Sequence, residues 1–124
     1  MKRKKVEMIG FKSSAGDFEK WPELIVDKLE AKFETIEKEL SEVGCDPLWC
    51  LIDSSENDLG AVRGVLERGK PDLVMVGAGV RMDPNQFLLF KKVVNAIHEE
   101  VPQARIAFNR NPFDTVLAVE RWLN

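Results

Sequence analysis

Four segments of strand length alternate with segments of helical pattern along the chain, and this alternation restricts the fold more than any other feature. The strand-like segments are residues 5–11, 48–52, 73–76 and 105–108. Two of them, 48–52 and 73–76, are continuous apolar runs, which are typical of parallel strands buried on both faces. Strands that alternate with helices form parallel sheets with helices on both sides. The sequence therefore predicts a three-layer α/β/α protein with a four-stranded parallel sheet.

The segments between the strands carry the marks of helices. From Pro22 to about Val43, apolar residues recur at steps of four and three, namely Ile25, Leu29, Phe33, Ile36, Leu40 and Val43. Pro22 suits the first helical position, and Gly44 suits the left-handed residue just past the end. A second helix is predicted over about 58–68, stopping at Gly69.

Two further helices are predicted to open with an N-cap residue and a proline. Asp83, Pro84 and Gln86 read as cap, first position and capping-box glutamine, and Asn111 with Pro112 opens the last helix in the same way. The third helix carries apolar residues at Phe87, Phe90, Val94 and Ile97, and the fourth at Phe113, Val116, Leu117 and Trp122. The segment 77–82 reads as the loop that follows a strand.

The strand order is predicted to be 2-1-3-4, which is the flavodoxin-like order without its last strand. Right-handed crossovers leave few other arrangements, of which simple winding in one direction is the alternative. A chain of 124 residues is the size of one domain, so residues 1–124 are expected to form a single Rossmann-like (βα)4 domain.

The C-terminal half resembles a group of small uncharacterised bacterial proteins. The resemblance lies in residues 71–81, in Phe87-Leu88-Leu89-Phe90, in Phe108-Asn109 and in the ending from Pro112 to Leu123. It implies the same kind of fold. No activity, cofactor or catalytic residue comes with it.

Composition indicates an ordinary globular protein and disfavours two classes of partner. Hydrophobic residues make up 44% and charged residues 31%, and the net charge of −3 offers no field that attracts nucleic acid or acidic membranes. The basic residues 2–5 are interpreted as solvated chain. Two cysteines are too few for a disulfide framework or a zinc site, so we expect a cytoplasmic protein without a metal, with Cys50 as a small hydrophobe and Cys45 as a loop thiol.

The candidate site lies where the strands end. In an open parallel sheet, ligands bind outside the carboxyl ends of the strands, at the point where the strand order reverses. The loops at that edge contain the predicted ligand-binding residues Lys12, Ser13, Ser14, Asp53, Gly77, Gly79, Arg81 and Asn109. Two cations, two hydroxyls and two glycines among them favour a phosphate or carboxylate group. The alternative is that the serines and glycines only form turns and that Arg81 is solvated.

No catalytic machinery or cofactor is predicted. A P-loop is absent, and Met82 occupies the place of the third glycine of a dinucleotide fingerprint. The single histidine, His98, is expected on the surface at the far end of its helix. The function that these patterns favour is a binding or regulatory module for an anionic small molecule. A homodimeric interaction module, suggested by the four apolar residues 87–90 and by the open sheet edges, is the first alternative, and an enzyme acting on a phosphorylated or carboxylated metabolite is the second.

Overall fold

The computed structural model describes residues 3–11, 26–52, 59–82, 86–110 and 114–122. Three helix starts were predicted, at Pro22, Asp83 and Asn111, and all three lie outside the described residues. The elements, in chain order, are β1 (Lys4–Phe11), α1 (Val26–Glu42), β2 (Cys45–Ile52), α2 (Leu59–Gly69), β3 (Leu73–Val76), α3 (Ala78–Met82), α4 (Phe87–Glu100), β4 (Arg105–Phe108) and α5 (Thr115–Glu120).

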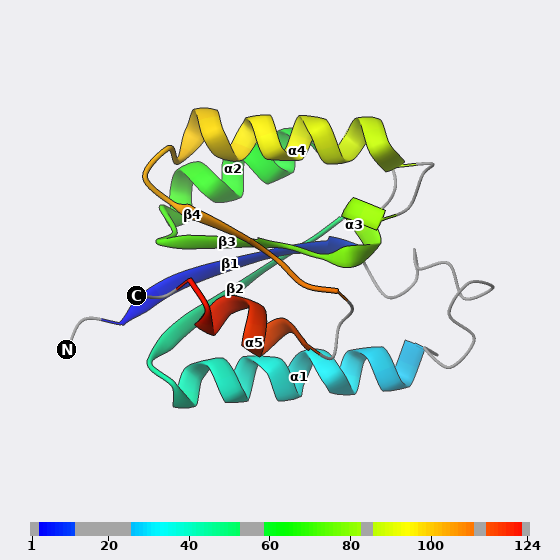
Figure 1. Cartoon of the computed structure of the whole chain (residues 1–124), viewed down its shortest axis with the longest axis vertical. Helices are drawn as coiled ribbons and strands as arrows, with labels where there is room; N and C mark the ends of the chain where they lie inside the picture. Colours follow the sequence, from blue (N-terminus) through cyan, green and yellow to red (C-terminus); the bar gives the residue numbers. More distant parts are fainter. Residues whose placement is uncertain (1–2, 12–25, 53–58, 83–85, 111–113, 123–124) are drawn as a thin grey trace.

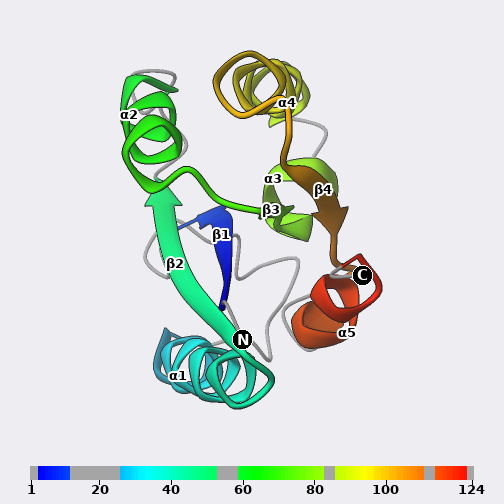
Figure 2. The same cartoon turned by 90° about the vertical axis from the view of Figure 1, so that its left-hand side faces the viewer.

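The four strands form one parallel sheet in the order β2-β1-β3-β4, which confirms the predicted order. Figure 1 shows α2 and α4 above the sheet and α1 and α5 below it, so the sheet is the middle of three layers. Seen from the amino ends of the strands in Figure 2, β2 and β4 occupy the two sides of the sheet. The order reverses between β1 and β3, because β2 is added on the outer side of β1 and β4 on the outer side of β3.

Each face of the sheet has its own apolar core, because side chains along a strand point alternately to the two faces. Ile9 of β1 belongs to the cluster beneath α2 and α4. Its neighbour Met8 belongs to the cluster above α1 and α5. β3 is buried along its whole length. The central position of β3 therefore follows from its apolar sequence, whereas β1 is central although it contains Glu7.

The bounds of β3 and β4 agree with the prediction, whereas β2 is three residues longer than predicted. It begins at Cys45 and includes Asp46 and Pro47. A proline is tolerated there because β2 is an edge strand, whose outer side needs no N–H donor. Cys45 is fully buried in this strand, so its interpretation as a loop thiol is wrong, while the burial of Cys50 is confirmed.

The helix ends show where glycine is needed and where it is not. Gly44 follows α1 with a φ of +92°, which confirms the predicted left-handed residue. At the end of α2 it is Lys70, with a φ of 44°, that takes this conformation, and Gly69 is the last helical residue. The stop after α2 was thus predicted one residue early. Val43, expected on the apolar face of the first helix, lies past its end and is exposed.

The face that α4 turns to the core differs from the predicted one. Its buried residues are Leu89, Val93, Ala96 and Ile97. Phe87 is exposed, and Phe90 and Val94 are only partly buried. In the last helix, Thr115, Ala118 and Val119 are buried, whereas Leu117 is exposed. Trp122, predicted in this helix, lies two residues past its end and is exposed. Within the described residues, the helices are too short or too polar to cross a lipid bilayer.

Candidate functional site at the carboxyl edge

The carboxyl ends of β1 and β3 are held close together at the point where the strand order reverses. The backbone N–H of Gly77 donates to the carbonyl oxygen of Ile9 over 2.8 Å. A Cβ atom at position 77 would lie 3.2 Å from that same oxygen and 3.7 Å from the Cα of Gly10. Position 77 therefore needs glycine because two backbones approach there.

The segment after β3, predicted as a loop, is the short helix α3. Its turn closes through the carbonyl oxygen of Gly77, which accepts from the N–H groups of Val80 and Arg81. The first N–H of the helix, that of Ala78, is taken by the side chain of Asn109 at 2.7 Å. A contact from the end of β4 thus caps this helix, and local sequence carries no sign of it.

Asn109 is a buried polar residue whose side-chain amide is engaged at both ends. Its Oδ1 accepts from Ala78, and its Nδ2 donates to Thr115 Oγ1 over 2.9 Å. The residue is 4% exposed. One side chain therefore joins the end of β4 to the first turns of α3 and α5.

Arg81 lies beside Asn109, with its guanidinium partly engaged. Its Nη2 donates to the backbone carbonyl of Asn109 over 2.7 Å. Its Cζ stands 5.6 Å from the centre of the Phe108 ring, a stacking distance for a cation on an aromatic face. Phe108 in turn meets Phe90 of α4 edge to face, with 6.0 Å between ring centres. These contacts hold the arginine at the carboxyl edge of β3 and β4.

One donor of this arginine has no partner among the described residues. The Nε of Arg81 is buried and makes no hydrogen bond there. A buried donor without an acceptor is costly, about 1–3 kcal/mol, so such an atom marks a place where an acceptor is expected.

The structure brings half of the predicted site residues together. Gly77, Gly79, Arg81 and Asn109 all lie at the carboxyl ends of β3 and β4. Lys12, Ser13, Ser14 and Asp53 lie outside the described residues. The backbone donors of positions 77 and 78 are used within the fold, so in the described part the side chain of Arg81 is the main group for an anion. Sequence reasoning missed Phe108 and Thr115. An aromatic residue at a strand end is a usable signal, whereas Thr115 opens α5, seven residues after β4 ends.

Two other charged residues lie near this edge: Arg110 follows Asn109, and its backbone N–H donates to Asp114 Oδ1 over 2.8 Å. His98 is exposed in the last turn of α4, as predicted, and that turn lies at the end of the helix opposite to Phe87. Among the described residues, no group of histidine, cysteine and carboxylate side chains is arranged to hold a metal ion.

Glu7, in the middle of β1, is fully buried and was not singled out by the sequence. Neither of its carboxyl oxygens has a hydrogen-bond partner among the described residues. It faces α2, because a Cβ built on Gly69 would lie 3.5 Å from Glu7 Oε1. Burial raises the pKa of this carboxyl from 4.5 to about 7. A neutral, protonated Glu7 is therefore the form that the fold favours.

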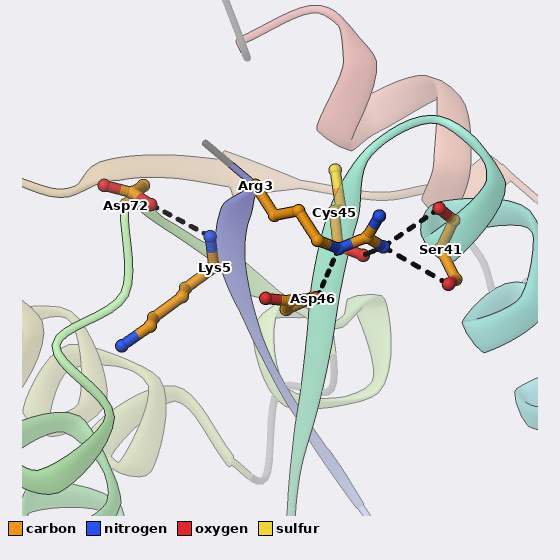
Figure 3. A network of polar contacts seen from close by, with 6 residues as sticks. All are labelled: Arg3, Lys5, Ser41, Cys45, Asp46 and Asp72. Carbon is orange, nitrogen blue, oxygen red and sulfur yellow. Dashed lines mark hydrogen bonds and ion pairs between the residues drawn. The ribbon is translucent and has the colours of Figure 1, made fainter. Parts of the chain in front are cut away.

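A polar network at the amino edge of the sheet is built on Arg3, shown in Figure 3. Its Nε donates to Asp46 Oδ1 over 2.6 Å, and its Nη2 donates to the backbone oxygens of Ser41 and Cys45. Ser41 lies in the last turn of α1, where backbone carbonyls lack helical partners. Arg3 thus joins the start of β1 to the end of α1 and to β2, a structural role that the reading of residues 2–5 as solvated chain overlooked.

Comparisons with protein-family models, curated proteins and solved structures found no match to this chain. The class of protein is therefore defined by geometry, as a parallel α/β sheet in the flavodoxin-like order. The arrangement at the carboxyl edge of this sheet is the basis for the function proposed below.

Proposed function

We propose that the protein is a small binding or regulatory module that takes an anionic small molecule at the carboxyl edge of the sheet. The ligand class is a molecule with a phosphate or carboxylate group. The observation that carries this proposal is the buried Nε of Arg81, which has no acceptor among the described residues. A guanidinium donates to such oxygens in a fork, and these charge-assisted bonds are stronger than neutral ones.

The position of this arginine supports the proposal. Arg81 follows β3 by five residues, and the strand order reverses between β3 and β1. Ligands of open α/β sheets bind at that point. The contacts with Phe108 and with the carbonyl of Asn109 fix the guanidinium before any ligand arrives, which lowers the entropy lost on binding.

We assign Asn109 a positioning role in this site. Both ends of its amide are engaged inside the fold, and its backbone oxygen holds Arg81. Lys12, Ser13 and Ser14 remain proposed ligand contacts on sequence grounds alone.

The test is the shift in melting temperature that inorganic phosphate, a nucleotide and a simple carboxylate produce. A ligand that binds only the folded state raises the melting temperature with its concentration. We expect at least one of the three to do so. The shift should be lost in Lys12→Ala/Arg81→Ala, each variant being compared with its own anion-free melting temperature.

Arg68→Ala is the matched control, because Arg68 lies in the last turn of α2, away from this edge. It should keep the full shift. If no anion shifts the wild-type chain, or if the double variant keeps the shift, the proposal fails.

A second candidate is a protein-interaction module that acts as a homodimer. The exposed apolar residues of α4 favour it, because Phe87 is 57% and Leu88 is 56% exposed. Charged and polar residues usually cover such a helix surface in a monomer. Sedimentation at micromolar concentration tests this candidate, and a monomer would remove it.

A further inference from the structure

The two edges of the sheet differ in how well they are protected from pairing. On β2, Pro47 removes one backbone donor, and the charged Asp46 is exposed beside it. Proline and charge are the usual means by which edge strands avoid pairing with another chain. β4, at the opposite side in Figure 2, has no proline; its one charged residue is Arg105 at the amino end, and its last residue, Phe108, is 41% exposed.

The backbone groups of β4 that face outward can be assigned from one hydrogen bond. The N–H of Arg105 donates to the carbonyl of Asp72, so this residue faces β3. Backbone direction alternates along a strand. The N–H and C=O groups of Ile106 and Phe108 therefore point away from β3, and no strand of the described residues pairs with that side.

An apolar surface continues from this edge onto α4. Phe87, Phe90 and Val94 follow one another at steps of three and four, so they share a flank of the helix. The contact between Phe90 and Phe108 shows that this flank lies on the β4 side. Phe87 is exposed, and its ring carries the ammonium of Lys91 at 4.8 Å.

We propose that β4 pairs edge to edge with β4 of a second copy of this chain, antiparallel and about a two-fold axis at Ala107. This inference rests on the second proposed function. In that register, Ile106 lies opposite the partner's Phe108, and both present outward-facing backbone groups to each other. The two Ala107 residues then lie opposite each other at the centre, as a non-hydrogen-bonded pair of the antiparallel ladder. The two four-stranded sheets would form a single eight-stranded sheet. The flanks of the two α4 helices that carry Phe87 would approach each other.

Charge complementarity favours a second copy as the occupant. Arg105 is exposed at the amino end of β4, on the face of the sheet that α5 covers, where its Nη1 also donates to the backbone oxygen of Trp122 over 3.2 Å. Asp114 lies at the carboxyl end on the same face, since the side chain of Asn109 bonds the adjacent Thr115, and the Oδ1 of Asp114 accepts from the backbone N–H of Arg110. Antiparallel pairing places Arg105 opposite the partner's Asn109, hence near the partner's Asp114. The two-fold axis repeats this pairing, so each copy supplies both charges.

Sedimentation of the full-length chain at micromolar concentration, combined with two kinds of variant, tests this interface. We expect the wild-type chain to be a dimer and Phe108→Glu to be a monomer, because the new charge would enter an apolar, desolvated contact. Leu88→Glu is the matched control. Leu88 is as exposed as Phe87, but it is neither on the flank of Phe90 nor on β4, so this variant should remain a dimer. Circular dichroism melting checks that each variant is folded.

Cross-linking tests the register separately. The Cα atoms of a pair without hydrogen bonds lie about 4.5 Å apart, within the range of a disulfide. Ala107→Cys should therefore form a covalent dimer under mild oxidation, and reductant should reverse it. The wild-type chain is the control, since its two cysteines, Cys45 and Cys50, lie in β2 and not in β4.

The outcomes separate the interface from the function on which it rests. A wild-type monomer overturns both. A wild-type dimer in which Phe108→Glu is still dimeric and Ala107→Cys does not cross-link overturns the edge pairing alone and leaves a dimer with another interface.

Discussion

The side chain of Asn109 caps the backbone of Ala78, a residue 31 positions earlier in the chain, through a hydrogen bond of 2.7 Å. This contact places the first turn of α3 against the end of β4, and it sets Arg81 next to Phe108. The candidate site therefore depends on a buried polar residue that does not itself face solvent.

Asn109→Ala should lower the free energy of unfolding by about 3 kcal/mol, because it removes two hydrogen bonds and leaves a buried N–H without an acceptor. Chemical denaturation measures this change. Asn95→Ala, the same substitution at an exposed position of α4, should change it by less than about 1 kcal/mol. Equal effects at the two positions would contradict the capping role.

Two glycine substitutions should have opposite signs. Gly77→Ala brings its Cβ to 3.2 Å from the backbone oxygen of Ile9, which cannot move without disturbing the sheet, so a loss of about 1–3 kcal/mol is expected. Gly60→Ala in α2 meets nothing within 4 Å. It should stabilise the chain by about 0.4–1 kcal/mol through helix propensity and a less flexible unfolded chain. Thermal and denaturant unfolding check both, and a stable Gly77→Ala would show that the strands need not approach so closely.

Glu7 should make stability fall as pH rises. Its folded pKa of about 7 lies above the ordinary value of 4.5, so the folded state binds the proton more tightly than the unfolded state does. This contribution is fully present below pH 4.5 and is lost as the pH rises through 7. At about 1.4 kcal/mol per pKa unit, the loss amounts to about 3 kcal/mol.

The measurement is the free energy of unfolding of wild type and Glu7→Gln across this range. The difference between them should shift in favour of the variant as the pH rises from 4.5 through 7 and stay level above that, because glutamine stays uncharged. Glu34→Gln, at an exposed position of α1, should track the wild type. If the free energy of unfolding of the wild type instead rose relative to that of Glu7→Gln as the pH rises, the carboxylate would have a stabilising partner.

Arg3→Ala should cost about 1–2 kcal/mol of stability, since it removes an ion pair and the hydrogen bonds to the last turn of α1. Arg3→Lys should restore only part of this, because an ammonium cannot donate to three acceptors in a planar fork. Lys4→Ala, at the exposed neighbouring position, is the control. Denaturant midpoints distinguish the three variants. Full stability in Arg3→Lys would show that Arg3 acts through its charge alone and not through the geometry of its hydrogen bonds.

The bounds of β3 and β4 were predictable because their apolar runs are bounded sharply by residues such as Pro71, Gly77 and Asn109. The strand order followed from the flavodoxin-like pattern and the right-handed crossover rule, which left simple winding in one direction as the alternative. Elements that depend on distant contacts were not. α3 contains Gly79 and directly follows Gly77, two glycines that favour a loop locally, and it forms where Asn109 reaches back to it. The start of β2 was hidden by Asp46 and Pro47, which are acceptable only because that strand is at an edge.

The four apolar residues that open α4 explain the error in its phase. Phe87, Leu88, Leu89 and Phe90 point all around the helix, so periodicity does not say which of them is buried. Packing on α2 and the sheet selects Leu89. The burial of Glu7 was equally beyond a sequence argument, since an alternating strand predicts an acidic residue on a solvated face.

The most direct test of the anion site is the side-chain Nε–H signal of Arg81 in ¹H–¹⁵N NMR spectra during titration with inorganic phosphate. Arg3 provides the internal reference, because its Nε already donates to Asp46 at the opposite edge of the sheet. Binding at the carboxyl edge predicts that the Arg81 signal moves and saturates while the Arg3 signal stays in place. An Arg81 signal that does not move, or that moves together with that of Arg3 without saturating, would contradict the proposed site.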